Sequence, residues 1–176
     1  MSFNPVNYVE MPLGEKAPYE FNVVVEIPKD GTQKYEFDHE LNVFRLDRSL
    51  YTSVHYPGDY GFLPQTLSED GDPLDVIIKC DKPTFTGCVI TVRPIGVLRM
   101  VDKGDNDYKI LAVPVGDSRT KNTKDIDDLS THYKGEIDHF FTVYKDLEGK
   151  QSSTEGWGDR DEAIEVIEAA MARYKR

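Results

Sequence analysis

Three aspartates lie directly before an apolar run in the stretch Glu69-Asp70-Gly71-Asp72-Pro73-Leu74-Asp75-Val76-Ile77-Ile78. Glycine and proline favour turns, and a residue that precedes proline is pushed toward extended backbone. The sequence therefore predicts a tight turn that carries Asp70 and Asp72, with Asp75 at the start of a strand. Carboxylates held this close repel one another unless a cation lies between them, and oxygen ligands suit a hard divalent cation such as Mg²⁺. A solvated acidic turn is the alternative interpretation of so short a motif.

Composition and charge limit the class of protein. A chain of 176 residues is long enough to bury a hydrophobic core, and we expect a single domain over residues 1–176. The net charge of −11 argues against binding to nucleic acid, which favours a basic surface. An anionic substrate would need metal ions or a local group of basic side chains in one cleft.

Two features predict a cytoplasmic protein that does not bind a membrane. The first residues, Met1-Ser2-Phe3-Asn4-Pro5, lack the charged and then apolar pattern of a signal peptide, and no apolar run approaches transmembrane length. The two cysteines, Cys80 and Cys88, form neither a C-x-x-C pair nor a zinc-type spacing. We therefore expect free thiols in a reducing compartment.

Alternating and apolar segments predict strands in the first two thirds of the chain. Residues 21–27 and 34–38 alternate, with a turn between them, and we expect a hairpin whose polar side presents Glu26, Lys34 and Glu36. Further strand-like runs occupy residues 42–46, 74–80, 88–92, 95–100 and 108–113. Seven or so short strands separated by turns are typical of a small barrel.

The remaining segments predict one irregular loop and two helices. Residues 51–64 are rich in aromatic and turn-forming residues, which favours a packed loop. Apolar residues then recur with helical spacing at Tyr133, Ile137, Phe140, Phe141 and Tyr144. Asp159 and Glu162 resemble a capping box that would begin a second helix. Its apolar side would carry Ile164, Ile167, Met171 and Tyr174. The predicted fold class is α+β, a small closed OB-like β-barrel with flanking α-helices.

A second pair of aspartates repeats the spacing of the first. Asp102 and Asp107 flank a turn before a strand and lie five residues apart, as Asp70 and Asp75 do. Two such loops that face each other would supply four oxygen ligands, which is enough for a two-metal site. The alternative is that Asp102, Asp105 and Asp107 only solvate the tip of a hairpin.

Basic residues accompany these carboxylates along the chain. Lys34, Arg48 and Lys109 each lie within two residues of an acidic residue, and Lys145 follows Tyr144 at the end of the predicted helix. Exposed ion pairs of this kind contribute only about 0–1 kcal/mol each. In the functional interpretation, the cations and tyrosine hydroxyls hold phosphate oxygens opposite bound metal ions. A Walker P-loop, a G-x-G-x-x-G motif and an EF-hand pattern are all missing from the sequence.

Eight short motifs follow one another in order: Val25-Glu26-Ile27-Pro28, Lys34-Tyr35-Glu36, Asp47-Arg48, Tyr56-Pro57-x-x-Tyr60-Gly61, Asp70-Gly71-Asp72-Pro73-Leu74-Asp75-Val76, Arg93-Pro94-Ile95-Gly96-Val97, Asp102…Asp107-x-Lys109 and His139-Phe140-Phe141-x-x-Tyr144-Lys145. Together they resemble family I soluble inorganic pyrophosphatase, and the chain length resembles the short prokaryotic type. The D-G-D-P-x-D element is highly specific for this family, and the resemblance runs from about Glu26 to Lys145.

The resemblance implies a fold, an activity and a set of site residues. It implies an OB-like barrel with flanking helices, Mg²⁺-dependent hydrolysis of pyrophosphate to two phosphates, and a homohexamer. By match to the motifs, the metal ligands would be Asp70, Asp75, Asp107 and Asp102. The phosphates would be bound by Lys34, Arg48, Tyr60, Lys109, Tyr144 and Lys145. Further side chains would line the site, namely Glu26, Glu36 and Tyr56.

The expected mechanism follows from the charge of the substrate. Pyrophosphate is strongly anionic, so metal ions must offset the carboxylates of the site. Two Mg²⁺ ions bridged by Asp75 would share one water and lower its pKa toward neutrality. Asp72 would act as the general base or orient this nucleophile. Arg48, Lys145 and Tyr144 would stabilise the charge that develops on the leaving phosphate.

Two other functions remain open from the residues. A Mg²⁺-dependent nucleotide phosphohydrolase would use the same kinds of side chain on a different phosphoanhydride. An OB-type module for single-stranded nucleic acid would stack bases on exposed aromatic rings. The candidate rings are Tyr51, Tyr56, Tyr60 and Phe62. The net charge of −11 and the lack of a basic stripe argue against this third function.

Overall fold

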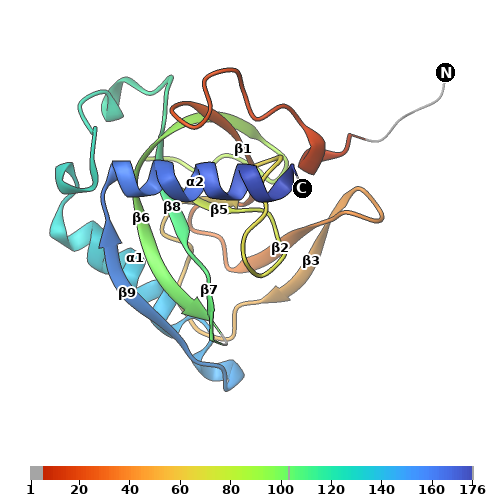
Figure 1. Ribbon diagram of the computed structural model, residues 1–176. Coiled ribbons are helices and arrows are strands. Elements are labelled where there is room, and N and C mark those ends of the chain that lie inside the picture. Colours follow the sequence, from red (N-terminus) through yellow and green to blue (C-terminus); the bar gives the residue numbers. More distant parts are fainter. Residues whose placement is uncertain (1–5, 103, 176) are drawn as a thin grey trace.

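A computed structural model of the protein describes residues 6–102 and 104–175, so residues 1–5, Lys103 and Arg176 lie outside the description (Figure 1). The strands are β1 (Phe21–Ile27), β2 (Gln33–Asp38), β3 (Val43–Ser49), β4 (Asp59–Phe62), β5 (Asp75–Ile78), β6 (Val89–Asp102), β7 (Asp105–Asn106), β8 (Lys109–Pro114) and β9 (Ser152–Gly158). The helices are α1 (Thr131–Val143) and α2 (Arg160–Tyr174). Four short 3₁₀ helices are η1 (Tyr8–Glu10), η2 (Ser118–Thr120), η3 (Ile126–Asp128) and η4 (Asp146–Glu148).

Five strands pair in a closed ring, in the order β1-β4-β5-β8-β6 and back to β1. The β5–β8 pair is parallel and the other four pairs of the ring are antiparallel. Strands β7 and β9 extend the sheet from β6, and β2 pairs with β3 in a separate hairpin. The predicted α+β fold, with an OB-like barrel and flanking helices, is confirmed.

Several predicted strands change their partners or bounds in the structure. The hairpin expected between β1 and β2 is wrong, because β1 pairs with β4 and β6. The two predicted runs around Arg93-Pro94 form one strand, β6, whose pairing with β8 shifts between Pro94 and Gly96. A proline cannot donate to the ladder, and such a register shift accommodates it without ending the strand.

The segment 51–64 is only partly the loop that its composition predicts, since residues 59–62 form the buried strand β4. Gly61 explains how this strand fits beside β1. A Cβ atom at this position would lie 1.9 Å from the carbonyl oxygen of Val24. Only glycine permits this approach, so Gly61 is required for the contact between β4 and β1.

The two long helices pack on different groups of core residues. α1 buries Ile137, Phe140 and Phe141 in a cluster with Tyr60 and Ile77 of the ring. α2 lies across the barrel and packs against β6 in a second cluster (Figure 1). The predicted apolar side of α2 is only partly right, because its buried residues are Ala163, Ile167 and Ala170. Small alanines at this face let α2 lie close to the sheet.

The start of α2 also differs in detail from the prediction. Asp159 is the N-cap, and its side chain accepts a hydrogen bond from the backbone N–H of Glu162 at 2.9 Å. The carboxylate of Glu162 forms an ion pair with Arg99 of β6. It therefore ties the helix to the barrel, and no reciprocal bond completing a capping box is seen at this cap.

Cys80 and Cys88 are both free, as predicted, and both are partly buried. Burial raises the pKa of the Cys80 thiol to about 11, so this group stays protonated near neutral pH. In the part of the chain that the structure describes, no helix is both long enough and apolar enough to span a bilayer.

Candidate active site

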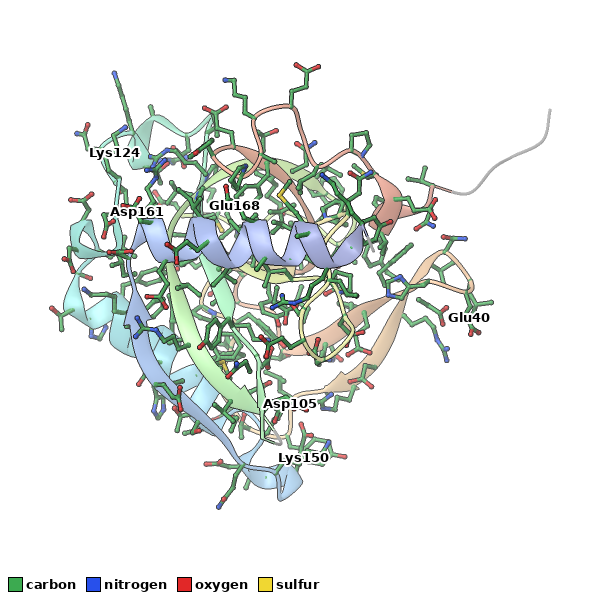
Figure 2. The ribbon with its side chains drawn as sticks, viewed as in Figure 1. Glu40, Asp105, Lys124, Lys150, Asp161 and Glu168 are labelled. Carbon is green, nitrogen blue, oxygen red and sulfur yellow. The ribbon has the colours of Figure 1, made fainter. Side chains whose placement is uncertain are left out.

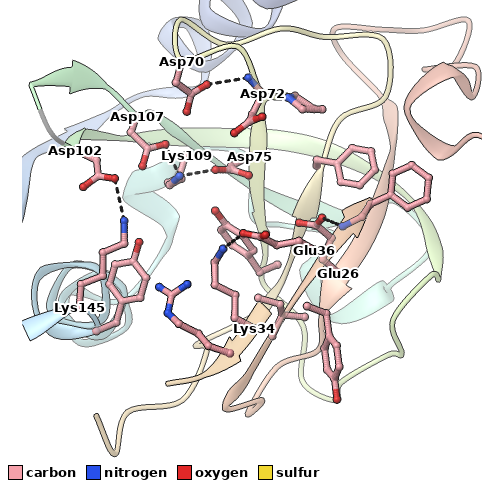
Figure 3. Close-up of a pocket in the computed structure, with 18 of the residues that line it drawn as sticks. Glu26, Lys34, Glu36, Asp70, Asp72, Asp75, Asp102, Asp107, Lys109 and Lys145 are labelled. Carbon is pink, nitrogen blue, oxygen red and sulfur yellow. Dashed lines mark hydrogen bonds and ion pairs between the residues drawn. The ribbon is translucent and has the colours of Figure 1, made fainter. Parts of the chain in front are cut away.

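One cavity of about 640 Å³ gathers thirteen of the fourteen predicted site residues (Figure 3). It opens between the β2–β3 hairpin, the acidic turn before β5 and the region where β6, β7 and β8 meet. Eight carboxylates line it: Glu26, Glu36, Asp70, Asp72, Asp75, Asp102, Asp105 and Asp107. Five cations line it as well: Lys34, Arg48, Lys109, Lys145 and Lys150. Opposite charges from distant parts of the chain therefore share one cavity.

The acidic turn has the form that its glycine and proline predict. Gly71 has a φ of 95°, a left-handed conformation that favours glycine. The backbone N–H of Asp72 donates to Oδ1 of Asp70 at 3.1 Å, and the carbonyl of Asp72 accepts from the N–H of Ser68 at 2.7 Å. The turn thus holds Asp70 and Asp72 at the exposed rim of the cavity, and Asp75 begins β5.

Lys109 lies at the centre of the carboxylate group. The parallel register of β5 and β8 pairs Asp75 with Lys109. The ammonium of Lys109 donates hydrogen bonds to both Asp75 and Asp107, and its side chain is only 4% exposed. Burial alone would lower the pKa of Lys109, but the charges of Asp75 and Asp107 outweigh burial and raise it. Lys109 is therefore a buried cation between two carboxylates.

A second ion pair at the cavity joins the segment after α1 to the end of β6. Lys145 directly follows Tyr144 at the end of α1, and its ammonium donates to Oδ2 of Asp102 at 2.9 Å. Both side chains are less than one fifth exposed. Burial opposes the charge of Lys145, yet Tyr144 and Asp102 together raise its pKa. Lys145 is therefore charged at neutral pH.

The β2–β3 hairpin supplies the remaining predicted cations. Its register places Lys34 beside Arg48. Lys34 pairs with Glu36 and lies 3.7 Å from Asp47, while Arg48 pairs with Asp47 and with Glu148. Each cation is therefore held between carboxylates at the wall of the cavity.

Glu26 connects β1 to this hairpin. Its Oε1 accepts a hydrogen bond from the backbone N–H of Phe37 at 2.8 Å. Burial raises the pKa of Glu26 to about 8, and the nearby charge of Asp75 acts in the same direction. In the absence of a cation, Glu26 is therefore mostly protonated at neutral pH.

Tyr60 and Tyr144 line the cavity, whereas Tyr56 does not. Tyr56 is 2% exposed and packs behind Tyr60, with ring centroids 5.3 Å apart. Burial raises the pKa of Tyr56 and of Tyr60 well above the usual value, so both keep their hydroxyl protons. Tyr56, Tyr60 and Phe62 are all buried, so of the rings considered for stacking bases only Tyr51 is exposed.

The side chains of the cavity fit a hard divalent cation in their chemistry. Carboxylate oxygens are the ligands that Mg²⁺ prefers, and the ammonium of Lys109 shows that positive charge is accommodated between Asp75 and Asp107. Within residues 6–102 and 104–175, no three His, Cys, Asp or Glu side chains are grouped closely enough to hold an ion as they stand. The side chains around Lys109 would have to rearrange for an ion to bind.

Several residues of the site were not among the predictions. Asp105, Asn106, His39 and Lys150 line the cavity, and Glu148 lies behind it in contact with Arg48. Asp105 lies between Asp102 and Asp107 in the sequence, so the clustering of aspartates there could have indicated that it belongs to the site. His39, Lys150 and Glu148 follow no periodic pattern, and only the folded chain brings them to the site.

Comparisons with known proteins place most of the chain in one family. The family model described as inorganic pyrophosphatase matches residues 23–175. The inorganic pyrophosphatase of a Synechocystis strain is 53% identical over 154 residues, covering 88% of this chain and 91% of that protein. The inorganic pyrophosphatase of Streptomyces coelicolor is 50% identical, covering 89% of this chain and 96% of that protein. A crystal structure of inorganic pyrophosphatase from Thermus thermophilus superposes with a TM-score of 0.95 at 42% identity, covering 97% of this chain and all of that one.

Proposed function

The chain belongs to the inorganic pyrophosphatase family and hydrolyses inorganic pyrophosphate, and we propose that it does so with several Mg²⁺ ions bound in the cavity around Lys109. One observation carries this proposal: eight carboxylates and five cations line a single cavity of about 640 Å³. Carboxylates alone would repel pyrophosphate, and cations alone would bind it without offering a place for metal. A cavity that holds both kinds of group suits a metal complex of a small, strongly anionic substrate.

Four aspartates are proposed to hold the metal: Asp70, Asp75, Asp102 and Asp107. They reach the cavity from two segments, the turn before β5 and the region around β7. When bound, Mg²⁺ offsets the charge of the phosphates and lowers the pKa of water. The ammonium groups of Lys109 and Lys145, which are paired with three of these aspartates, would then be available to phosphate oxygens.

The phosphates are proposed to be bound by cations and hydroxyl groups: Lys34, Arg48, Lys109, Lys145, Tyr60 and Tyr144. All six line the cavity. Hydrogen bonds from charged donors to phosphate are short and about twice as strong as neutral ones. Arg48, Lys145 and Tyr144 would stabilise the charge that develops on the leaving phosphate, because phosphoryl transfer depends mainly on positioned charge.

Asp72 is proposed as the group that accepts a proton from the attacking water or orients it. It lines the cavity at the rim, and in the part of the chain that the structure describes its carboxylate forms no ion pair. Partial desolvation and the charges of Asp70 and Asp75 raise the pKa of Asp72, which favours proton acceptance. Glu26 and Glu36 would complete the wall and hold water molecules around the metal.

Phosphate release is the experiment that tests the function. The full chain is stripped of metal with a chelator and assayed with pyrophosphate or ATP, in Mg²⁺ and then in Mn²⁺ or Zn²⁺. We expect release from pyrophosphate that depends on Mg²⁺, and little from ATP. Comparable release from ATP would assign a nucleotide phosphohydrolase instead, and no release with any metal would contradict the proposal.

The assembly and compartment are also proposals. We propose a cytoplasmic protein that acts as a homohexamer, with residues 1–176 as one domain. The resemblance to the short prokaryotic family members supports this, together with the coverage of the Thermus thermophilus chain along its whole length. Light scattering coupled to size-exclusion chromatography measures the assembly, and a mass near 20.1 kDa would contradict the hexamer.

A further inference from the structure

Glu148 is a buried carboxylate that lies beside the cavity without lining it. It is the last residue of η4, where Leu147 is 68% exposed while the side chain of Glu148 is only 4% exposed. Leucine side chains are usually buried and glutamate side chains usually exposed, so the burial of these two neighbours is reversed. Burial of a carboxylate costs free energy unless the group is paired and hydrogen-bonded, so the partners of Glu148 must account for its position.

The partners of Glu148 are two cations of the cavity wall. Its Oε1 accepts a hydrogen bond from Nε of Arg48 at 2.7 Å, and its Oε2 accepts one from Nζ of Lys150 at 3.1 Å. Arg48 and Lys150 both line the cavity, and Arg48 lies 100 residues before Glu148 in the chain. Burial raises the pKa of Glu148, but hydrogen bonds from Arg48 and Lys150 outweigh burial and lower it. The carboxylate is therefore ionised.

The guanidinium of Arg48 is held at two of its three nitrogens. Its Nε donates to Glu148 and its Nη1 donates to Asp47. Among the described residues, no protein acceptor is found for Nη2. A guanidinium is planar and rigid, so fixing two of its nitrogens also fixes the direction of the third. The Nη2 N–H groups are thus available to an anion in the cavity.

We propose that Glu148 is a positioning residue for pyrophosphate hydrolysis, which orients Arg48 and Lys150 toward phosphate oxygens in the cavity. This inference rests on the proposed function of the same site. Arg48 has a long side chain with large rotamer entropy. Without Glu148 it would be free to turn toward other carboxylates, and eight of these line the cavity. Glu148 keeps the guanidinium in one orientation.

A double-mutant cycle distinguishes positioning from a structural role. Glu148→Ala and Glu148→Gln are each made in the wild-type chain and in the Arg48→Ala chain, and kcat and KM for magnesium pyrophosphate are measured. We expect Glu148→Ala to lower kcat/KM by about 10- to 100-fold in the wild-type chain, as small misplacements do. Glu148→Gln should lose less, because its amide oxygen can still accept from Arg48. In the Arg48→Ala chain the same change should cost about threefold or less.

Glu155→Gln is the matched control, since Glu155 is exposed on β9 and does not line the cavity. It should keep the kcat/KM of the wild type. An equal loss from Glu148→Ala in both backgrounds, or no loss in either, would overturn the positioning role. If Glu148→Ala does not fold, as judged by circular dichroism, the Glu148→Gln variants complete the cycle.

The same double-mutant cycle can be measured without turnover, as the affinity of each variant for inorganic phosphate in the presence of Mg²⁺. Calorimetry gives this affinity. We expect weaker binding for Glu148→Gln than for the wild type, and no further weakening in the Arg48→Ala background. A wild-type chain that releases no phosphate from pyrophosphate would contradict the proposed function alone, and the binding cycle would still decide the role of Glu148. Phosphate binding that is unaffected by both Glu148 variants would overturn the inference.

Discussion

Lys145, two residues beyond the end of α1, meets Asp102, at the end of β6, with 2.9 Å between its ammonium nitrogen and a carboxylate oxygen. Both residues line the cavity, and both side chains are less than one fifth exposed. A helix that packs on one face of the barrel thus delivers a cation to aspartates carried by the barrel itself.

Removal of this cation should lower the rate of the reaction. We expect Lys145→Ala to reduce kcat for magnesium pyrophosphate by about 100-fold or more, since loss of one donor to developing charge typically has this effect. Steady-state phosphate release measures it. Lys124→Ala is the control and should keep full activity, because Lys124 does not line the cavity and lies at the other end of the molecule from Asp105 and Lys150, which do (Figure 2). A Lys145→Ala variant with the kcat of the wild type would contradict the role of Lys145.

Asp75 should be essential for metal-dependent turnover and dispensable for folding. Asp75→Ala removes one carboxylate from Lys109, which keeps its hydrogen bond to Asp107. We therefore expect activity below about 1% of the wild type with a native circular dichroism spectrum. Asp161→Ala, at the exposed start of α2 (Figure 2), should keep its activity. Activity like that of the wild type in Asp75→Ala would refute the metal assignment.

Replacement by asparagine should have different effects at Asp70 and at Asp72. Asp72→Asn is expected to lower kcat by about 100-fold, within the usual range for loss of a general base, with little change in Mg²⁺ affinity. Asp70→Asn is expected to weaken Mg²⁺ binding measured by calorimetry. If Asp72→Asn weakens Mg²⁺ binding as strongly as Asp70→Asn does, then Asp72 is a ligand and not a base.

Arg48→Lys should impair the enzyme although it keeps the charge. The planar guanidinium of Arg48 can donate to Glu148, to Asp47 and to an anion at the same time. The compact ammonium of a lysine cannot reproduce this arrangement. We expect kcat/KM to fall by about 10- to 100-fold. This range corresponds to the loss of one hydrogen bond to a charged group, which is worth about 1.5–3 kcal/mol. Arg45→Lys is the control on the same strand, since the side chain of Arg45 is 65% exposed. Equal activity of the two variants would show that charge alone matters at residue 48.

Glu26 should make the stability of the metal-free protein depend on pH. Its pKa rises from 4.5 to about 8 on folding, so between these values the folded chain binds more protons than the unfolded chain. The free energy of unfolding therefore falls as pH rises through this window. Glu26→Gln still accepts from Phe37 but cannot ionise, so it should lose less stability than the wild type between pH 5 and 8.

Urea unfolding at pH 5 and pH 8, with a chelator present, measures this difference. We expect the two proteins to diverge by a few kcal/mol at most, because one pKa unit corresponds to about 1.4 kcal/mol. Glu155→Gln should follow the wild type at both pH values. Parallel pH dependences of Glu26→Gln and the wild type would show that Glu26 is not buried in a protonated form.

Local patterns were sufficient for many elements and for the composition of the site. Alternation placed β1 at residues 21–27, and the glycine and proline of the acidic turn placed Asp75 at the start of β5. The motifs named thirteen residues that one cavity brings together, although their roles remain predictions. Alternation, turn residues and short motifs each involve residues that are close in sequence, so they can be recognised in a single sequence.

Long-range pairing was not available from such patterns. β1 pairs with β4 and β6, whose positions depend on the closure of the ring and not on the turn that follows β1. β9 contains polar residues and two glycines, and it becomes a strand because it pairs along β6. Glu148 meets Arg48 across 100 residues of sequence. Each of these features depends on tertiary contacts.

The parallel register of β5 and β8 has a consequence for insertions and deletions. Side chains alternate between the two faces of a strand, so a shift of one residue turns each side chain to the opposite face. Deletion of one residue within β5 would replace Asp75 beside Lys109 with an apolar neighbour and point a carboxylate into the hydrophobic core. An extra residue at the hairpin tip near Glu40 (Figure 2) would change neither face. The hydrogen-bond ladder of the barrel thus sets where natural or engineered length variation is tolerated.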